Sequence, residues 1–86
     1  MEHLRDADSA IQTQRELLQA LFAEKRKHEN DIERLYELYL SGEIPKEGFE
    51  RKYQPLYDRL KELENEIPRL QGELDFYTIQ HRSYWR

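Results

Sequence analysis

Large apolar side chains recur along the first half of the chain at alternating intervals of three and four residues. Six of nine such positions are large and apolar, and the residues between them are mostly charged or amidic: Ile11, Gln14, Leu18, Leu21, Lys25, His28, Ile32, Leu35 and Tyr39. A 3.5-residue repeat is the signature of a helix that packs through one narrow seam against another helix. We therefore expect a helix over about residues 8–40, with Asp8 or Ser9 as its N-cap.

The segment Ser-Gly-Glu-Ile-Pro at 41–45 interrupts this pattern. Gly42 is placed to adopt the left-handed conformation just past a helix end, and Pro45 has the fixed φ that suits the opening of a new helix. We expect a turn at 41–45, a second helix over about 46–80 and a short tail at 81–86. Pro55 and Pro68 should bend the second helix, with Pro68 the better candidate for a kink because it is interior.

The second half carries its own heptad pattern, in which all nine positions are apolar or aromatic: Phe49, Tyr53, Leu56, Leu60, Leu63, Ile67, Leu70, Leu74 and Tyr77. When the chain is folded back at the turn, the two sets pair symmetrically about residue 44, from Tyr39 with Phe49 to Ile11 with Tyr77. A short connection makes the helices antiparallel neighbours. The sequence thus predicts an all-α fold, an antiparallel two-helix coiled-coil hairpin forming an arm of roughly 45 Å.

Two polar residues, Lys25 and His28, occupy seam positions in the middle of the first helix. One interpretation is that their apolar stems pack in the seam while their polar ends reach water. The other is that a polar pair at mid-seam fixes the register and weakens the arm locally.

Composition narrows the class of protein. The 86 residues allow one domain at most, and 37% of them are charged. A compact globule of this length would be hard to stabilise with so few apolar residues, which favours packing along one narrow seam. Both long segments, 1–40 and 41–75, carry more acidic than basic groups, which argues against direct nucleic-acid binding by the shaft. The charged first residues do not resemble a signal peptide and no apolar run is long enough to span a membrane, so we expect a soluble protein inside the cell.

The residues that usually carry chemistry are not grouped in ways that suggest a site. There are no cysteines, and His3, His28 and His81 are far apart with no partner at ligand spacing, so we expect no metal site. The carboxylates fall on exposed heptad positions, and neither a catalytic triad nor a phosphate-binding glycine loop is present. We expect no cofactor and no catalytic site in this chain.

The turn is where apolar residues exceed what two helices can bury. Leu40 and Ile44 flank Gly42, Tyr36 and Tyr39 lie within about one helical turn of Leu40, and Phe49 is the first seam residue beyond the turn. Exposed apolar groups at a tip indicate a contact site for another protein. The alternative is that Leu40 and Ile44 only cap the seam locally. Tyr84 and Trp85 form a second aromatic group, which is either the loose end of a fragment or a docking point for a neighbouring domain.

Residues 31–80 resemble the coiled-coil arm of large serine recombinases of the phage-integrase type. The likeness lies in LYLSGEI at the turn, FERKY after it and ELDFYTIQ at the descending end. The family's capping box after the turn is replaced here by Pro45 to Gly48. The catalytic serine domain and the zinc-ligand cysteines of the family are absent from this chain.

The resemblance implies a non-catalytic arm that holds recombinase subunits together during DNA integration and helps to control its direction. Its tip would contain Leu40, Ser41, Gly42, Glu43 and Ile44. The implied partners are another copy of the arm, bound through the tip, and a recombination directionality factor. The implied location is the cytoplasm of a bacterial host that carries a phage or mobile element.

Two other functions fit a helical hairpin. A standalone adaptor, similar to the hairpins of prefoldin, would hold a client protein at its tip. A nucleic-acid-gripping arm, such as the hairpin of a tRNA synthetase, is disfavoured by the acidic shaft. A serine recombinase catalytic domain and a cysteine-rich ribbon in the same reading frame would distinguish the first interpretation from the second.

Overall fold

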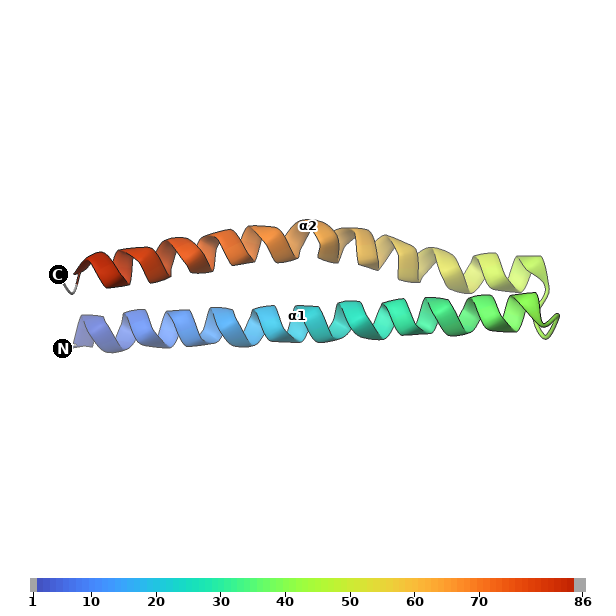
Figure 1. Cartoon of the computed structure of the whole chain (residues 1–86), viewed down its shortest axis with the longest axis horizontal. Coiled ribbons are helices and arrows are strands. Elements are labelled where there is room, and N and C mark those ends of the chain that lie inside the picture. The colour runs from blue at the N-terminus through green and yellow to red at the C-terminus, as the bar shows by residue number, and fades with distance from the viewer. Residues whose placement is uncertain (1, 85–86) are drawn as a thin grey trace.

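The chain folds into two long helices that lie antiparallel and pack against each other along their length (Figure 1). The computed structural model describes residues 2–84, and it describes side-chain surroundings for residues 9–79. Helix α1 spans Glu2–Leu40 and helix α2 spans Lys46–Tyr84. Within the described range every element is helical, which confirms the predicted all-α hairpin.

Both helices extend beyond the residues expected from the heptads. Helix α1 begins at Glu2 instead of near residue 8, because residues 2–8 are mostly good helix formers and include neither Gly nor Pro. The expected N-cap is therefore wrong: Ser9 lies inside α1, where its carbonyl accepts a 2.9 Å hydrogen bond from the Thr13 hydroxyl. Helix α2 continues to Tyr84 instead of ending near residue 80. The arm is accordingly 62 Å long and about 16 Å wide, longer than the expected 45 Å.

The core of the hairpin is the predicted seam. The buried apolar side chains all belong to the two heptad sets: Ile11, Leu18, Leu21, Leu35, Leu63, Ile67 and Leu70. Leu63 has no exposed surface at all. Tyr39 and Tyr77, assigned to the outermost layers, are exposed instead, although Ile11 in the same layer as Tyr77 is buried. The proposed docking of Tyr84 and Trp85 on another domain concerns side chains outside the described residues.

The turn joins the helices with a Schellman motif. The amide of Glu43 donates to the carbonyl of Leu38 at 3.0 Å, and the amide of Gly42 donates to the carbonyl of Tyr39 at 3.1 Å. Gly42 has φ of 81°, the left-handed conformation that this motif requires. Helix α2 then opens with the carbonyl of Pro45 accepting the amide of Phe49 at 2.9 Å, so Pro45 is the N-cap and offers no side-chain acceptor.

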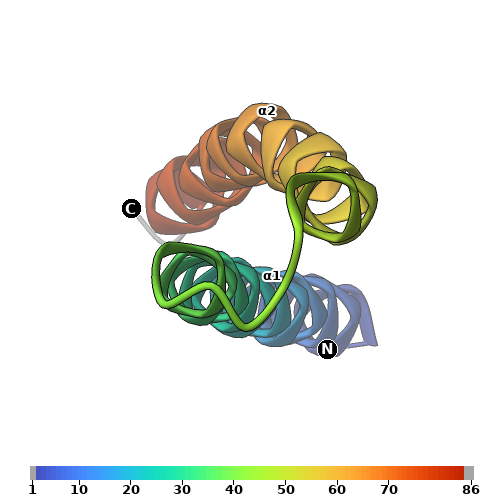
Figure 2. The same ribbon diagram turned by 90° about the vertical axis from the view of Figure 1, so that its right-hand side faces the viewer.

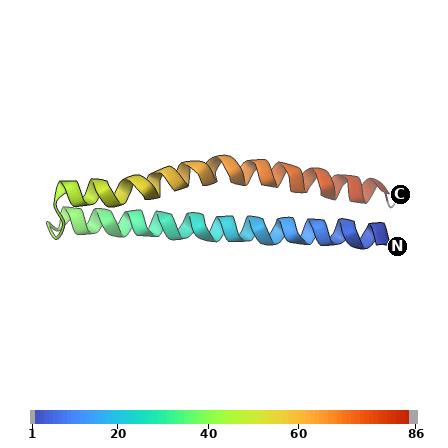
Figure 3. The ribbon, with the colours of Figure 1, turned by 180° about the vertical axis from the view of Figure 1, so that it is seen from behind.

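Helix α2 is bowed away from α1 in its middle, whereas α1 is nearly straight (Figures 1 and 3). Pro55 and Pro68 lie inside α2 on either side of its midpoint. Each lacks an amide hydrogen and crowds the preceding turn, which accounts for a curve in this helix alone. Viewed along the arm from the tip, the two helices cross over each other between the turn and the termini (Figure 2).

Candidate functional site

Five aromatic rings form a continuous row from the tip of the arm along both helices. We call it the aromatic row; it consists of Tyr36, Tyr39, Phe49, Tyr53 and Tyr57. Phe49 is its centre, with ring centroids 5.0 Å from Tyr36, 4.9 Å from Tyr39 and 5.4 Å from Tyr53. Tyr57 extends the row, its centroid 5.6 Å from that of Tyr53. These separations are typical of favourable aromatic pairs, so the row stiffens this end of the hairpin.

The aromatic row presents much of its surface to solvent. Tyr36, Tyr39 and Tyr57 are exposed, while Phe49 and Tyr53 are half-buried between them. The ammonium group of Lys61 lies 5.4 Å from the centroid of Tyr57, where it adds a positive charge to the far end of the row. Rings held by their neighbours lose little conformational freedom when a partner covers them, which suits them to a binding surface.

The tip of the hairpin separates the two apolar residues that flank Gly42. Leu40, the last residue of α1, is 79% exposed and is the most exposed of the large apolar side chains described. Ile44 is half-buried, so of the two residues Leu40 is the one that the hairpin leaves exposed. Gly42 and Glu43 are exposed between them. All seven predicted contact residues therefore lie at one end of the arm, and the ring of Phe49 contacts those of both Tyr36 and Tyr39.

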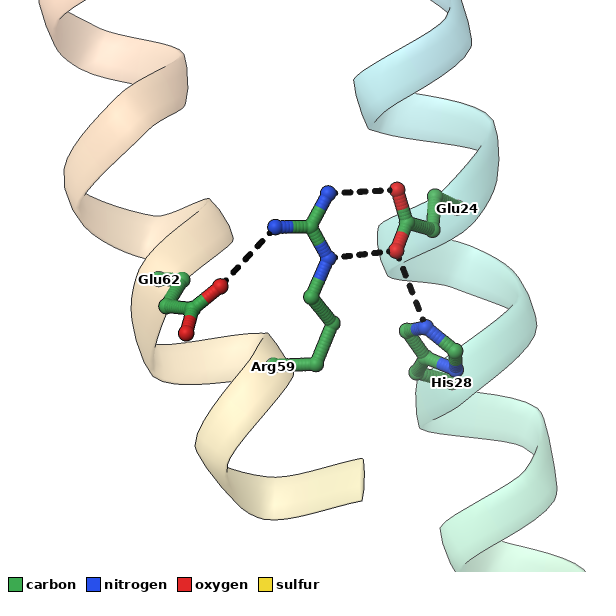
Figure 4. Close-up of polar contacts among 4 residues, drawn as sticks. All are labelled: Glu24, His28, Arg59 and Glu62. Atoms are coloured by element: carbon green, nitrogen blue, oxygen red, sulfur yellow. Dashed lines mark hydrogen bonds and ion pairs between the residues drawn. The ribbon is translucent and has the colours of Figure 1, made fainter. Parts of the chain in front are cut away.

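A charged cluster joins the helices on one flank of the seam, near the middle of the arm (Figure 4). Arg59 of α2 donates two parallel hydrogen bonds to Glu24 of α1, from Nε to Oε2 at 2.6 Å and from Nη2 to Oε1 at 2.9 Å. Its Nη1 donates to Glu62 Oε2 at 2.9 Å. The Arg59 hydrogen bonds lower the pKa of Glu24 from 4.5 to about 2, and the bond to Glu24 is the main cause that raises the pKa of Arg59. The pair thus stays ionised over a wide pH range.

His28 adds a third contact to Glu24. Its Nε2 lies 3.2 Å from Glu24 Oε2, one turn away along α1. Its Nδ1 is buried and has no hydrogen-bond partner, and Lys25 beside it is half-buried. The side chain of His28 is therefore anchored at one nitrogen while the other is buried. This differs from the expectation that the polar end of His28 simply reaches water.

Sequence reasoning did not find the Glu24–Arg59 pair or the full length of the aromatic row. The signal for the pair was present, because Glu24 and Arg59 each directly precede a seam position and so fall on the same flank of an antiparallel coiled coil. The heptad spacing assigns Tyr53 to the seam and places Tyr57, four residues later, beside it. Their stacking depends on ring orientations, which heptad spacing does not specify.

The described part of the chain offers no other obvious chemistry. Its His, Asp and Glu side chains nowhere gather in a group of three that would hold a metal ion. No helix in the described range has a stretch that is both long enough and apolar enough to cross a membrane.

Comparisons with known proteins return no relatives. No family model matches the chain, and neither the curated proteins nor the solved structures include a significant match to it.

Proposed function

We propose that this chain is a non-catalytic protein–protein interaction arm of a site-specific DNA recombinase, which binds a second copy of itself through its tip. In that role it brings two DNA-bound subunits together during integration and takes part in directionality control. The observation that carries the proposal is the tip itself, where Leu40 is almost fully exposed beside a row of packed aromatic rings. The assignment to a recombinase rests on the sequence likeness at 31–80.

The tip is both rigid and exposed, as a contact surface must be. The Schellman turn holds Leu40 and Glu43 in fixed positions at the end of the arm. Aromatic and aliphatic side chains at the centre of a contact contribute most of its binding energy when water is excluded around them. An arm 62 Å long also places that contact far from whatever adjoins the termini, which suits the joining of two separate complexes.

The first test measures self-association of the purified chain by sedimentation velocity over a concentration series. Leu40→Asp should weaken association at least tenfold while leaving the helical circular dichroism unchanged, because burying an unpaired carboxylate is unfavourable and the seam is untouched. Leu17→Asp is the matched control: Leu17 is an apolar residue of the shaft, 44% exposed, and its change should leave association intact. Equal losses in both variants would refute a tip contact.

The second test addresses the recombinase assignment. The chain replaces the native arm of a large serine recombinase, and paired attachment sites are followed by gel shift. We expect pairing of two sites with the wild-type arm, and binding of single sites without pairing with Leu40→Asp. Self-association of the chain without any pairing activity in the recombinase would instead support the adaptor function.

A further inference from the structure

The two flanks of the seam carry different side chains in the half of the arm nearest the tip. With the seam at positions a and d of each heptad, position e holds a carboxylate and a tyrosine on each helix: Glu29 and Tyr36 on α1, Glu50 and Tyr57 on α2. In an antiparallel pair of helices these positions border the same flank of the seam. The ring of Tyr36 accordingly lies near that of Tyr53 across the seam, with 6.2 Å between their centroids. We call these four e-position residues, together with Glu33 one turn before Tyr36, the acidic aromatic flank.

The register of the hairpin brings a carboxylate close to the level of each exposed ring on this flank. The ring contact in the outermost seam layer, 4.9 Å between centroids, fixes that register at the tip. Glu50 is then about 3 Å from the level of Tyr36, measured along the arm. Glu29 is equally near the level of Tyr57. Rings and carboxylates therefore alternate along one side of the arm, instead of gathering in separate places.

The hairpin does not use the carboxylates of this flank. Glu29, Glu33 and Glu50 are exposed, and none of them forms an ion pair with another side chain in the range 9–79. The basic residues nearest in sequence, Arg34 and Lys52, lie on the other flank, where both line an open crevice with a floor of leucines. Acidic and basic groups are thus segregated to opposite sides of the seam in this half of the arm.

One cation of the chain itself shows what this combination of groups attracts. The ammonium group of Lys61 lies 5.4 Å from the centroid of Tyr57 and 3.9 Å from a carboxylate oxygen of Glu64, so it sits between a ring and a carboxylate at the inner end of the same flank. A ring face and a carboxylate both favour positive charge. Tyr36, which is 46% exposed, offers the same two kinds of group together with its neighbouring carboxylates.

We propose that the acidic aromatic flank binds a basic segment of a partner protein, with an arginine stacked on Tyr36 and held by Glu33 and Glu50. Arginine suits the site better than lysine, because its planar guanidinium group stacks on a ring while it donates to carboxylates. A second copy docked through the same flank would oppose carboxylates with carboxylates, so this surface does not serve that kind of self-association. The proposal goes beyond the self-association of the tip and does not depend on the recombinase assignment.

The first test titrates the full ¹⁵N-labelled chain with a short peptide of alternating arginine and glycine, at a chain concentration where sedimentation shows a single species. Chemical-shift changes should concentrate in residues 29–36 and 50–57. The matching lysine–glycine peptide should bind at least threefold more weakly, and the glutamine–glycine peptide should not bind. Shift changes centred on the flank of Arg34 and Lys52, or equal affinities for the arginine and lysine peptides, would overturn the proposal. No binding, with tip association intact, would refute this proposal and leave the proposed function of the tip standing.

A pair of double variants separates a defined site from the net negative charge of the chain. Glu33→Gln with Glu50→Gln should weaken binding of the arginine peptide at least tenfold. Asp31→Asn with Glu73→Gln is the matched control: it removes the same charge from exposed positions on the other flank, neither in an ion pair within the range 9–79, and should leave the Kd within twofold. Circular dichroism should be unchanged in both. Equal weakening by the two double variants would rule out the site.

Discussion

The Glu24–Arg59 pair is the contact through which single residues most directly tie α1 to α2. Both side chains are about one third exposed, so water screens the attraction and the pair contributes modestly in spite of its bidentate geometry. The direction in which its contribution to stability changes with pH is nevertheless fixed. A carboxyl whose pKa is depressed in the folded state stabilises the fold at pH values above its ordinary pKa and loses that contribution as pH falls through the folded value.

We therefore expect Glu24→Gln to lower the Tm at pH 7 and to have progressively less effect as pH falls from about 5 to about 2. The limits follow from the ordinary pKa of 4.5 and the folded value of about 2. Thermal melts followed by circular dichroism measure the difference between the two proteins at each pH. Glu33→Gln serves as control, since Glu33 is exposed and forms no ion pair with another side chain in the range 9–79. A difference in Tm between the two proteins that stays constant down to pH 2 would contradict a lowered pKa of Glu24 in the folded state.

The polar pair in the seam leads to a second prediction for single residues. Replacing Lys25 and His28 together with Leu should raise the Tm by about 5 °C or more, because apolar surface is buried and the unpaired Nδ1 of His28 is removed. The hydrogen bonds from Arg59 to Glu24 remain in this variant. Thermal melts at pH 7 provide the measurement. A lower Tm would mean that the His28–Glu24 contact stabilises the hairpin more than an apolar layer does.

The turn is the element on which the geometry of the tip depends. Gly42→Ala should destabilise the hairpin by about 1–2 kcal/mol, because the left-handed conformation is unfavourable for a residue with a Cβ. The space around Gly42 is open, so the penalty arises from the backbone alone. Gly42→Asn is the control, since Asn tolerates this conformation better and should show a smaller loss. Denaturant unfolding gives both values, and equal losses for Ala and Asn would argue against a backbone origin.

The whole hairpin is specified by the register between its two seams. Cysteines at positions 32 and 56 should cross-link within one chain, since the seam pairs Ile32 with Leu56, whereas cysteines at 32 and 74 should not. The chain has no cysteines of its own, so each double variant reports on one pair only. Oxidation followed by mass spectrometry identifies the intramolecular bond. Efficient linking of 32 to 74 would show that the helices are paired in another register.

The sequence predicted those features that follow from spacing, and missed those that follow from orientation or from the helix ends. Leu63 and Ile67 are buried because the heptad repeat alone brings them to face α1. The stacking of Tyr53 on Tyr57 depends on side-chain rotamers. The start of α1 at Glu2 depends on weak helix propensities, with no residue that clearly marks the first turn. At the tip, spacing placed Leu40 and Ile44 together, and only the path of the turn separates the exposed residue from the half-buried one.

The most direct test of the account is a distance measurement between copies of the chain. A spin label on a cysteine at position 43 reports on the tip, and one at position 19 reports on the shaft of α1; both residues are exposed in the single chain. Pulsed electron–electron double resonance on the associated, singly labelled chain should give a short intermolecular distance for the tip label and a long one for the shaft label. A short distance between shaft labels, with tip labels far apart, would contradict an arm that acts through its tip.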